Sequence, residues 1–248
     1  MDSQAKSTIG VKDLKKSFGS QKVLDGISFD LGEGKVTCVL GRSGTGKSVL
    51  LKLLIGLETP DSGTICLVGV DVVKSPITEL NEARKKVGFL FQQAALYDSM
   101  TIEENVAFPL LRHLKLSDSE RRDRVQQLLS SVGLDKDLAK LPSQISGGMK
   151  KRVGLARALA LEPMAVMFDE PTAGLDPMSA AEIAKLIADL RDQRHITSLV
   201  VTHDLHTARS IADRLIVLDA GKIIFDGTLQ QFEHSSNSFV TQFLKDAA

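Results

Sequence analysis

The stretch from Gly41 to Ser48, GRSGTGKS, constrains this sequence more than any other. It follows the apolar, β-branched run KVTCVL and opens an apolar helical stretch, which is the context that the pattern G-x-x-x-x-G-K-[ST] requires. Glycines are needed because successive backbone amides must curl around a phosphate with no Cβ in the way. Lys47 is predicted to reach the outer phosphates, and the Ser48 hydroxyl to ligate Mg²⁺. The sequence therefore predicts an α/β unit that binds a phosphate chain.

A second motif predicts the acidic partner of that loop. The run MAVMFDE, residues 164–170, is typical of a buried strand that ends in two carboxylates. Asp169 is placed to hold Mg²⁺ through its water shell, and Glu170 to orient an attacking water. His203 lies just beyond the next apolar run, in VVTHD. A histidine there is more often a capping or packing residue, but beside the other motifs we interpret it as functional.

The stretch QISGGMKKR, residues 144–152, predicts a helix whose start lacks a counter-charge. Ser146 can cap the first turn, and two glycines leave backbone amides uncovered. No acidic residue follows; instead Lys150, Lys151 and Arg152 bring cations to an end that the helix dipole already makes positive. We interpret this end as a receptor for an anion that the chain itself does not supply, with the cations assisting it.

The overall charge excludes some partners. The 31 basic and 31 acidic side chains cancel, so the net charge favours neither nucleic acid nor an anionic membrane surface. No apolar run approaches the ~18 residues of a membrane span, and the start MDSQAKSTIG lacks the apolar core of a signal peptide. Cys38 and Cys66 lie in strand-like runs and are expected to be buried, reduced thiols. We expect a soluble, cytoplasmic protein that binds no nucleic acid.

The pattern of strands and helices predicts one domain over residues 8–245. Short strands separated by glycine turns precede the glycine loop and indicate an antiparallel region. Roughly residues 94–162 are predicted to form a helical insertion, which contains a capping box from Ser117 to Glu120. Strand-like runs then resume, and a later helix is capped by Asp176. The expected fold class is α/β: a P-loop NTPase core with an N-terminal antiparallel β subdomain and an inserted helical subdomain.

With these motifs assembled, the chain resembles the ATP-binding-cassette (ABC) ATPases over nearly its whole length. ISGGM then resembles the signature motif of that family, which closes over the γ-phosphate of a nucleotide held by the other subunit of a head-to-tail dimer. The resemblance implies ATP and Mg²⁺ as cofactors. The implied ATP-binding residues are Phe18, Gly41, Arg42, Ser43, Gly44, Thr45, Gly46, Lys47, Ser48, Val49, Ser146, Gly147, Gly148, Met149 and Asp176. The implied catalytic residues are Glu170, His203 and Gln92, and the implied metal-binding residues are Ser48, Gln92 and Asp169.

The resemblance also implies individual roles. Phe18 resembles the aromatic residue that stacks on adenine, and Gln92 the glutamine that contacts Mg²⁺ and senses the permease. Asp176 resembles a dimer-contact aspartate, and His203 the histidine that holds the γ-phosphate. Met149 departs from the glutamine that most members carry, so any hydrogen bond made by that glutamine is lost.

Further segments narrow the resemblance to one branch. SGTGKS, ISGGM followed by KKR, ALYDSMTIEENVAFPL and VTQFL together resemble the ATPases of the Mla and Mce lipid-transport systems. This implies two copies of the chain beneath an integral-membrane permease dimer at the cytoplasmic face of the inner membrane. Further implied partners are an MCE-domain lipid-binding protein and a STAS-domain subunit. The apolar residues between Gln92 and Pro109, among them Ala94 and Val106, are expected to line a groove for the permease.

The sequence gives less support to other classes of P-loop ATPase and GTPase. A DNA-organising ABC ATPase would need a long coiled coil between the glycine loop and the signature, and ribosome-associated members normally join two cassettes; the sequence has neither. A P-loop GTPase would be expected to carry an N-K-x-D motif, which the sequence lacks. Within transport, the ATPase subunit of an amino-acid or drug transporter remains open.

Overall fold

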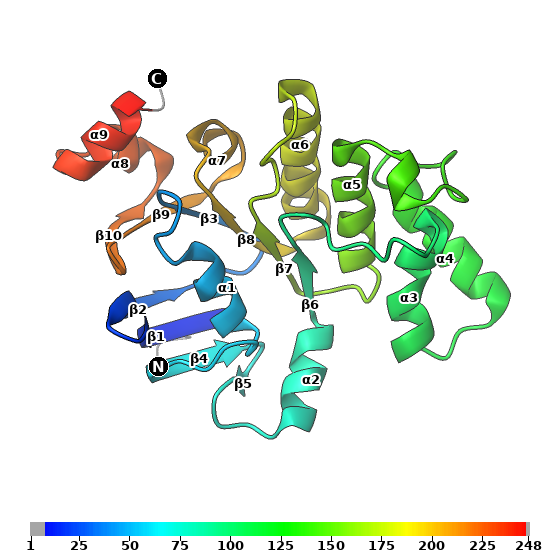
Figure 1. The fold of residues 1–248 in the computed structure, drawn as a ribbon, viewed down its shortest axis with the longest axis horizontal. Helices are drawn as coiled ribbons and strands as arrows, with labels where there is room; N and C mark the ends of the chain where they lie inside the picture. The colour runs from blue at the N-terminus through cyan, green and yellow to red at the C-terminus, as the bar shows by residue number, and fades with distance from the viewer. Residues whose placement is uncertain (1–7, 247–248) are drawn as a thin grey trace.

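A computed structural model describes residues 8–246 as two sheets with helices around them (Figure 1). The first sheet is antiparallel, in the order β2-β1-β4-β5. Its strands are β1 (Ile9–Phe18), β2 (Gln21–Asp30), β4 (Ser62–Leu67) and β5 (Val70–Asp71). The second sheet has the order β10-β9-β3-β8-β7-β6 and is parallel except for β10. Its strands are β3 (Val36–Leu40), β6 (Val87–Leu90), β7 (Ala165–Asp169), β8 (Thr197–Thr202), β9 (Arg214–Asp219) and β10 (Lys222–Gly227).

The central strands are continuously apolar because both faces of the second sheet are covered. On one face, Val39, Met167 and Val201 pack in a core shared with α1 (Lys47–Leu54) and the antiparallel sheet. Their chain neighbours Phe168 and Val200 point the other way, into a second core formed with the remaining helices. The period of two along each strand thus builds two cores on one sheet.

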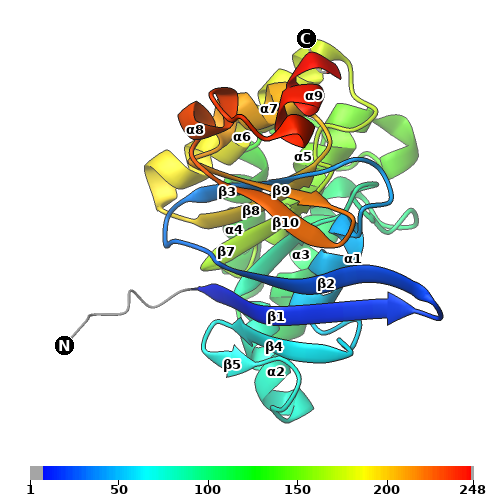
Figure 2. The same cartoon turned by 90° about the vertical axis from the view of Figure 1, so that its left-hand side faces the viewer.

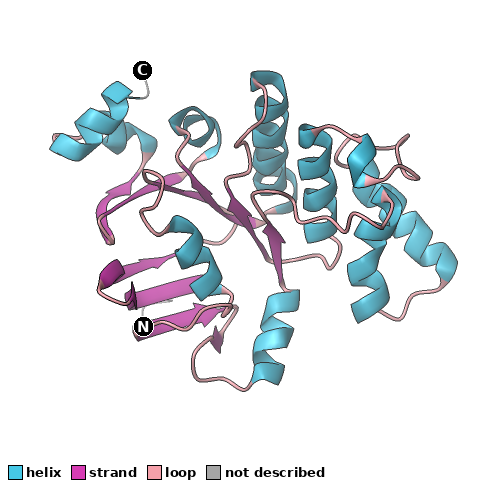
Figure 3. Ribbon diagram, in the orientation of Figure 1, coloured by secondary structure: helices cyan, strands magenta, loops and turns pink. Residues whose placement is uncertain are grey.

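The helices fall into groups around this sheet. Beyond the β6 edge lie α3 (Ile102–His113), α4 (Asp118–Ser130), the 3₁₀ turn η1 (Pro142–Gln144) and α5 (Gly147–Ala158) (Figure 3). The remaining helices are α2 (Ile77–Lys85), α6 (Pro177–Arg194), α7 (Leu205–Ile211), α8 (Leu229–Glu233) and α9 (Ser238–Asp246). Helices α6 to α9 lie across the second sheet from the antiparallel sheet (Figure 2). None of the helices described in residues 8–246 is long and apolar enough to cross a membrane.

Several local predictions can be compared directly with the structure. The capping box at Ser117 and Glu120 is present at the start of α4, and the Asp176 side chain caps α6. Cys38 is buried as expected, but the expectation for Cys66 is wrong: its side chain is exposed, because it lies on the outer face of β4. Helices α3, α4 and α5 all fall within the predicted insertion, whose limits of 94–162 remain a prediction.

Gly88 sets how closely β6 approaches α5. A Cβ at this position would lie 2.6 Å from the carbonyl oxygen of Ala158, at the end of α5. Because that atom belongs to the backbone of a helix, it cannot rotate away as a side chain would. The strand that leads to Gln92 is therefore packed against the helix that begins at the signature segment.

We predict that Gly88→Ala destabilises the fold. The added methyl would push α5 away from β6, and overpacking of this kind costs about 1–3 kcal/mol. A lower midpoint in thermal and urea unfolding of the full chain would verify this. Gly32→Ala is the matched control, because a Cβ at Gly32 meets only the Lys35 side chain, at an ordinary 3.5 Å. Equal midpoints for the two variants would contradict the close-packing explanation.

Candidate active site

The motifs predicted from the sequence surround a pocket of about 360 Å³ at the carboxyl end of the second sheet. Predicted residues that line it are Phe18, Ser43, Gly44, Gly46, Lys47, Ser48, Val49, Gln92, Glu170 and His203. They come from distant parts of the chain. In a parallel sheet, ligands bind outside the carboxyl ends of the strands, where these loops meet.

The glycine loop takes a shape that side chains would block. Gly46 has a φ of +96°, and a Cβ there would lie 2.7 Å from Cγ1 of Val23. The Lys47 ammonium donates to the carbonyls of Gly41 at 2.8 Å and Arg42 at 3.0 Å. Helix α1 then begins with no acidic residue in its first turn and no capping side chain. Its N-terminal amides therefore favour an anion.

The end of β7 faces this loop. The Ser48 hydroxyl donates to Oδ1 of Asp169 at 3.1 Å. Burial raises the pKa of Asp169, while the Ser48 hydrogen bond opposes that rise. The Lys47 ammonium lies 3.6 Å from Oε1 of Glu170. Burial lowers the pKa of Lys47, and the charge of Glu170 works against it. Opposed buried charges therefore stabilise one another across the pocket.

Glu170 is held at several points. Its Oε2 accepts from the Thr202 hydroxyl at 3.2 Å and lies 2.9 Å from Nδ1 of His203. Its backbone N–H donates to the Val201 carbonyl at 2.9 Å. Its φ of +47° is in the left-handed region, which side chains other than glycine rarely adopt. Such strain is typical of functional sites, and it directs the carboxylate into the pocket.

Other predicted residues lie next to the pocket or apart from it. Gly41, Arg42 and Thr45 shape the loop; the Thr45 hydroxyl, for example, donates to the Arg42 carbonyl at 2.9 Å. Asp169 reaches the site through Ser48. The residues Ser146, Gly147, Gly148, Met149 and Asp176 lie apart from the pocket, at the starts of α5 and α6.

The start of α5 confirms part of the sequence interpretation. The Ser146 side chain accepts from the Met149 backbone at 3.2 Å, and no acidic residue lies in the first turn. The interpretation that the following cations face the same anion is wrong for Lys151 and Arg152. Lys151 is only 4% exposed and donates to the Glu170 carbonyl at 3.0 Å. Arg152 donates to the Val132 carbonyl at 3.3 Å.

The sequence analysis missed two residues at the site, Val23 and Thr202, and the contact that Lys151 makes there. Val23 lines the pocket beneath Gly46, and an apolar residue in a strand gives no signal for this. Thr202 contacts Glu170 and could have been found as the neighbour of His203. Lys151 contacts the Glu170 carbonyl from α5. The run of cations drew attention to Lys151, but it did not indicate that the side chain points toward Glu170.

Two residues expected to line the permease groove between Gln92 and Pro109 lie in the hydrophobic core. Ala94 and Val106 are 1% and 0% exposed, so they belong to the hydrophobic core and cannot line a groove for a permease. Tyr97 of the same segment is exposed, and a permease groove at the other apolar positions stays a prediction. Ordinary packing within the helical region accounts for the buried positions.

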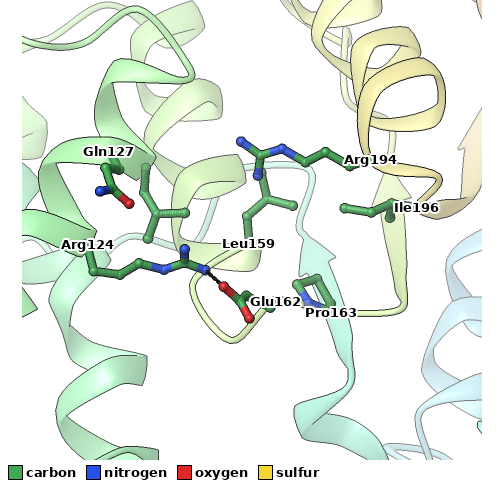
Figure 4. A pocket seen from close by; sticks show the side chains of 8 residues that line it. Arg124, Gln127, Leu159, Glu162, Pro163, Arg194 and Ile196 are labelled. Atoms are coloured by element: carbon green, nitrogen blue, oxygen red, sulfur yellow. Dashed lines mark ion pairs between the residues drawn. The ribbon is translucent and has the colours of Figure 1, made fainter. Parts of the chain in front are cut away.

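One of several larger pockets lies elsewhere and does not compete for this role. It measures about 430 Å³ and is bounded by α4, the turn after α5 and the end of α6 (Figure 4). Arg124 pairs there with Glu162 at 2.6 Å, and Arg194 also lines the pocket. It contains none of the predicted site residues. The smaller pocket is the candidate active site, because chemistry rather than size distinguishes it.

Known proteins resemble this chain closely. The probable ribonucleotide transport ATP-binding protein mkl of Mycobacterium leprae is 44% identical over 95% of this chain and 68% of its own length. The intermembrane phospholipid transport system ATP-binding protein MlaF of Haemophilus influenzae is 41% identical over 96% of this chain and 90% of its own length. The methionine import ATP-binding protein MetN of Rhizobium johnstonii is also 41% identical, but the chain spans only 61% of it.

The family and the fold agree. The sequence model of the ABC transporter family matches residues 24–173. A solved dimeric ATP-binding cassette, in a post-hydrolysis state bound to ADP and Pi, has a TM-score of 0.82 and 32% identity. The match covers 89% of this chain and 98% of that one. The chain therefore belongs to the ABC transporter family, as an ATP-hydrolysing subunit with the nucleotide-binding fold that the sequence predicted.

We predict that Glu170→Gln keeps ATP binding but slows hydrolysis. The amide preserves the shape of the side chain and removes a base whose loss typically costs ~10² to 10⁴ in rate. Nucleotide titration and phosphate release by the full chain measure the two effects separately. Glu79→Gln, an exposed change on α2, is the control. Turnover by Glu170→Gln close to that of the parent would remove Glu170 from the mechanism.

Proposed function

We propose that this chain powers phospholipid transport through a membrane permease, as one half of a head-to-tail dimer. The choice of phospholipid as the cargo rests on the match to MlaF, which extends over 96% of this chain and 90% of that protein. The matches to mkl and MetN leave about a third or more of those proteins uncovered. Of these three relatives, MlaF is the one whose length this chain covers most fully.

Mg²⁺ fits the polar groups of the pocket. Magnesium is bound through one or two carboxylates together with substrate phosphates and water. Asp169 supplies a carboxylate, Ser48 a hydroxyl already within 3.1 Å of it, and Gln92 a side-chain oxygen on the same pocket. When bound, the ion would neutralise charge on the phosphates of ATP. These three residues are the proposed metal-binding set.

The remaining steps use residues of this chain. The glycine loop amides and Lys47 bind the β- and γ-phosphates, and Phe18 stacks on the adenine. The Glu170 carboxylate positions the attacking water and takes its proton, while His203 holds the γ-phosphate. The hydrogen bonds that Glu170 makes with Thr202 and His203 support this, since they fix the carboxylate at the rim of the phosphate loop.

The dimer explains the anion that the start of α5 lacks. In the proposed arrangement, Ser146, Gly147 and Gly148 donate to the γ-phosphate bound by the partner copy, with Met149 and Asp176 beside them. Support comes from the first turn of α5, which carries no acidic residue, and from the Asp176 carboxylate, which is already held as the cap of α6. An acid near Gly147 would compete with the phosphate.

Phospholipid transport would require a larger membrane complex. Two copies of the chain would lie at the cytoplasmic face of the inner membrane, bound to a permease dimer. An MCE-domain lipid-binding protein and a STAS-domain subunit would complete the complex. No role with nucleic acid is proposed, because basic and acidic residues balance at 31 each.

We predict that the complex carries phospholipid. The chain would be purified with its native membrane partner and the bound lipid identified by mass spectrometry, with the Glu170→Gln complex as a hydrolysis-deficient control. Phospholipid should be enriched over the membrane extract and should stimulate ATP turnover in reconstituted vesicles. Methionine or another amino acid is the rival cargo, because MetN is as identical as MlaF. Stimulation by an amino acid and none by phospholipid would contradict the proposal.

A further inference from the structure

Lys151 is a buried cation without a place in the mechanism above. It lies in α5, one turn after the capping residue Ser146, and is 4% exposed. Removing an ammonium from water is costly unless it is paired. Its Nζ donates to the backbone carbonyl of Glu170 at 3.0 Å. Burial lowers the pKa of Lys151 to about 8, and the charges of Asp169 and Glu170 oppose that fall.

The carbonyl that Lys151 holds belongs to a strained residue. Glu170 has a φ of +47°, a strained conformation that a non-glycine residue keeps only where its surroundings fix it. The Glu170 N–H is fixed by the Val201 carbonyl, and the Ala173 N–H donates to the Glu170 carbonyl at 3.2 Å. Lys151 adds a contact from a further element, the helix α5. The direction of the Glu170 side chain follows from this backbone.

We propose that Lys151 is a positioning residue for ATP hydrolysis. Its ammonium holds the Glu170 peptide in the left-handed conformation and so aims the carboxylate at the water that attacks ATP. It touches neither the nucleotide nor the reacting atoms. The proposal rests on the proposed role of Glu170. It also explains why Lys151 turns inward, because its ammonium contacts the Glu170 carbonyl of its own chain from the second turn of α5.

Lys151→Met tests this, since it keeps the length and apolar stem of the side chain and removes the donor. We expect kcat to fall by ~10- to 100-fold, the size expected of a misplaced catalytic group, with ATP affinity changed by less than about threefold. Lys185→Met, an exposed change on α6, is the matched control and should leave both values unaltered. Lys151→Gln, whose shorter side chain cannot span the same distance, gives the same test if the methionine variant does not fold.

A double variant separates positioning from general stability. If Lys151 acts through Glu170, adding Lys151→Met to Glu170→Gln should cost less than about twofold in further rate, because coupled residues are not additive. A full further loss in the double variant, or parent-like kcat in Lys151→Met, would overturn the proposal. Parent-like kcat in Glu170→Gln would instead overturn the role of Glu170. Slow turnover by Glu170→Gln together with normal turnover by Lys151→Met would overturn the positioning role of Lys151 and leave the role of Glu170 intact.

Discussion

The parallel register of β3, β8 and β7 is the constraint on which the site depends. Leu40 pairs with Thr202, and Val201 pairs with Asp169, so the three strands end at one level. The glycine loop, Glu170 and His203 leave the sheet there as adjacent loops. Lys47 can therefore reach to within 3.6 Å of Glu170, although the two residues are far apart in the chain. A slip of one register position would turn the strand side chains to the opposite core and separate these groups.

Charge organises the rest of the site. Lys47 and Lys151 are both buried near the carboxylates at the end of β7; Lys47 donates to the Gly41 and Arg42 carbonyls and Lys151 to the Glu170 carbonyl. The N-terminus of α1 has no acidic residue in its first turn and adds positive potential to the site. The N-terminus of α5 likewise has no acidic residue in its first turn. The same helix α5 also fixes the loop after Gln92, because Arg157 donates to the Ala94 and Ala95 carbonyls at 2.7 and 2.8 Å. Cations of α5 thus hold two left-handed segments of one chain.

Much of this was available from the sequence because it rests on local chemistry. The glycine spacing predicted the phosphate loop, apolar runs predicted strands buried on both faces, and Ser146 predicted the start of α5. The predictions that failed concern the direction in which a side chain points in the folded protein. Helical spacing did not reveal that Lys151 turns inward, nor strand composition that Cys66 faces outward. Val23 enters the pocket through a close approach of β2 to Gly46, which no motif records.

The central claim is that one nucleotide site is shared between two copies of the chain. Lys47→Ala damages the phosphate loop and Ser146→Arg fills the start of α5, so each homodimer has two damaged sites. In a mixed dimer, isolated with two different tags, a shared site collects both lesions in one site and leaves the other whole. Vanadate trapping of nucleotide should therefore be restored in the mixed dimer to well above either parent. If the mixed dimer traps no more nucleotide than the parents, the start of α5 does not serve the partner's nucleotide.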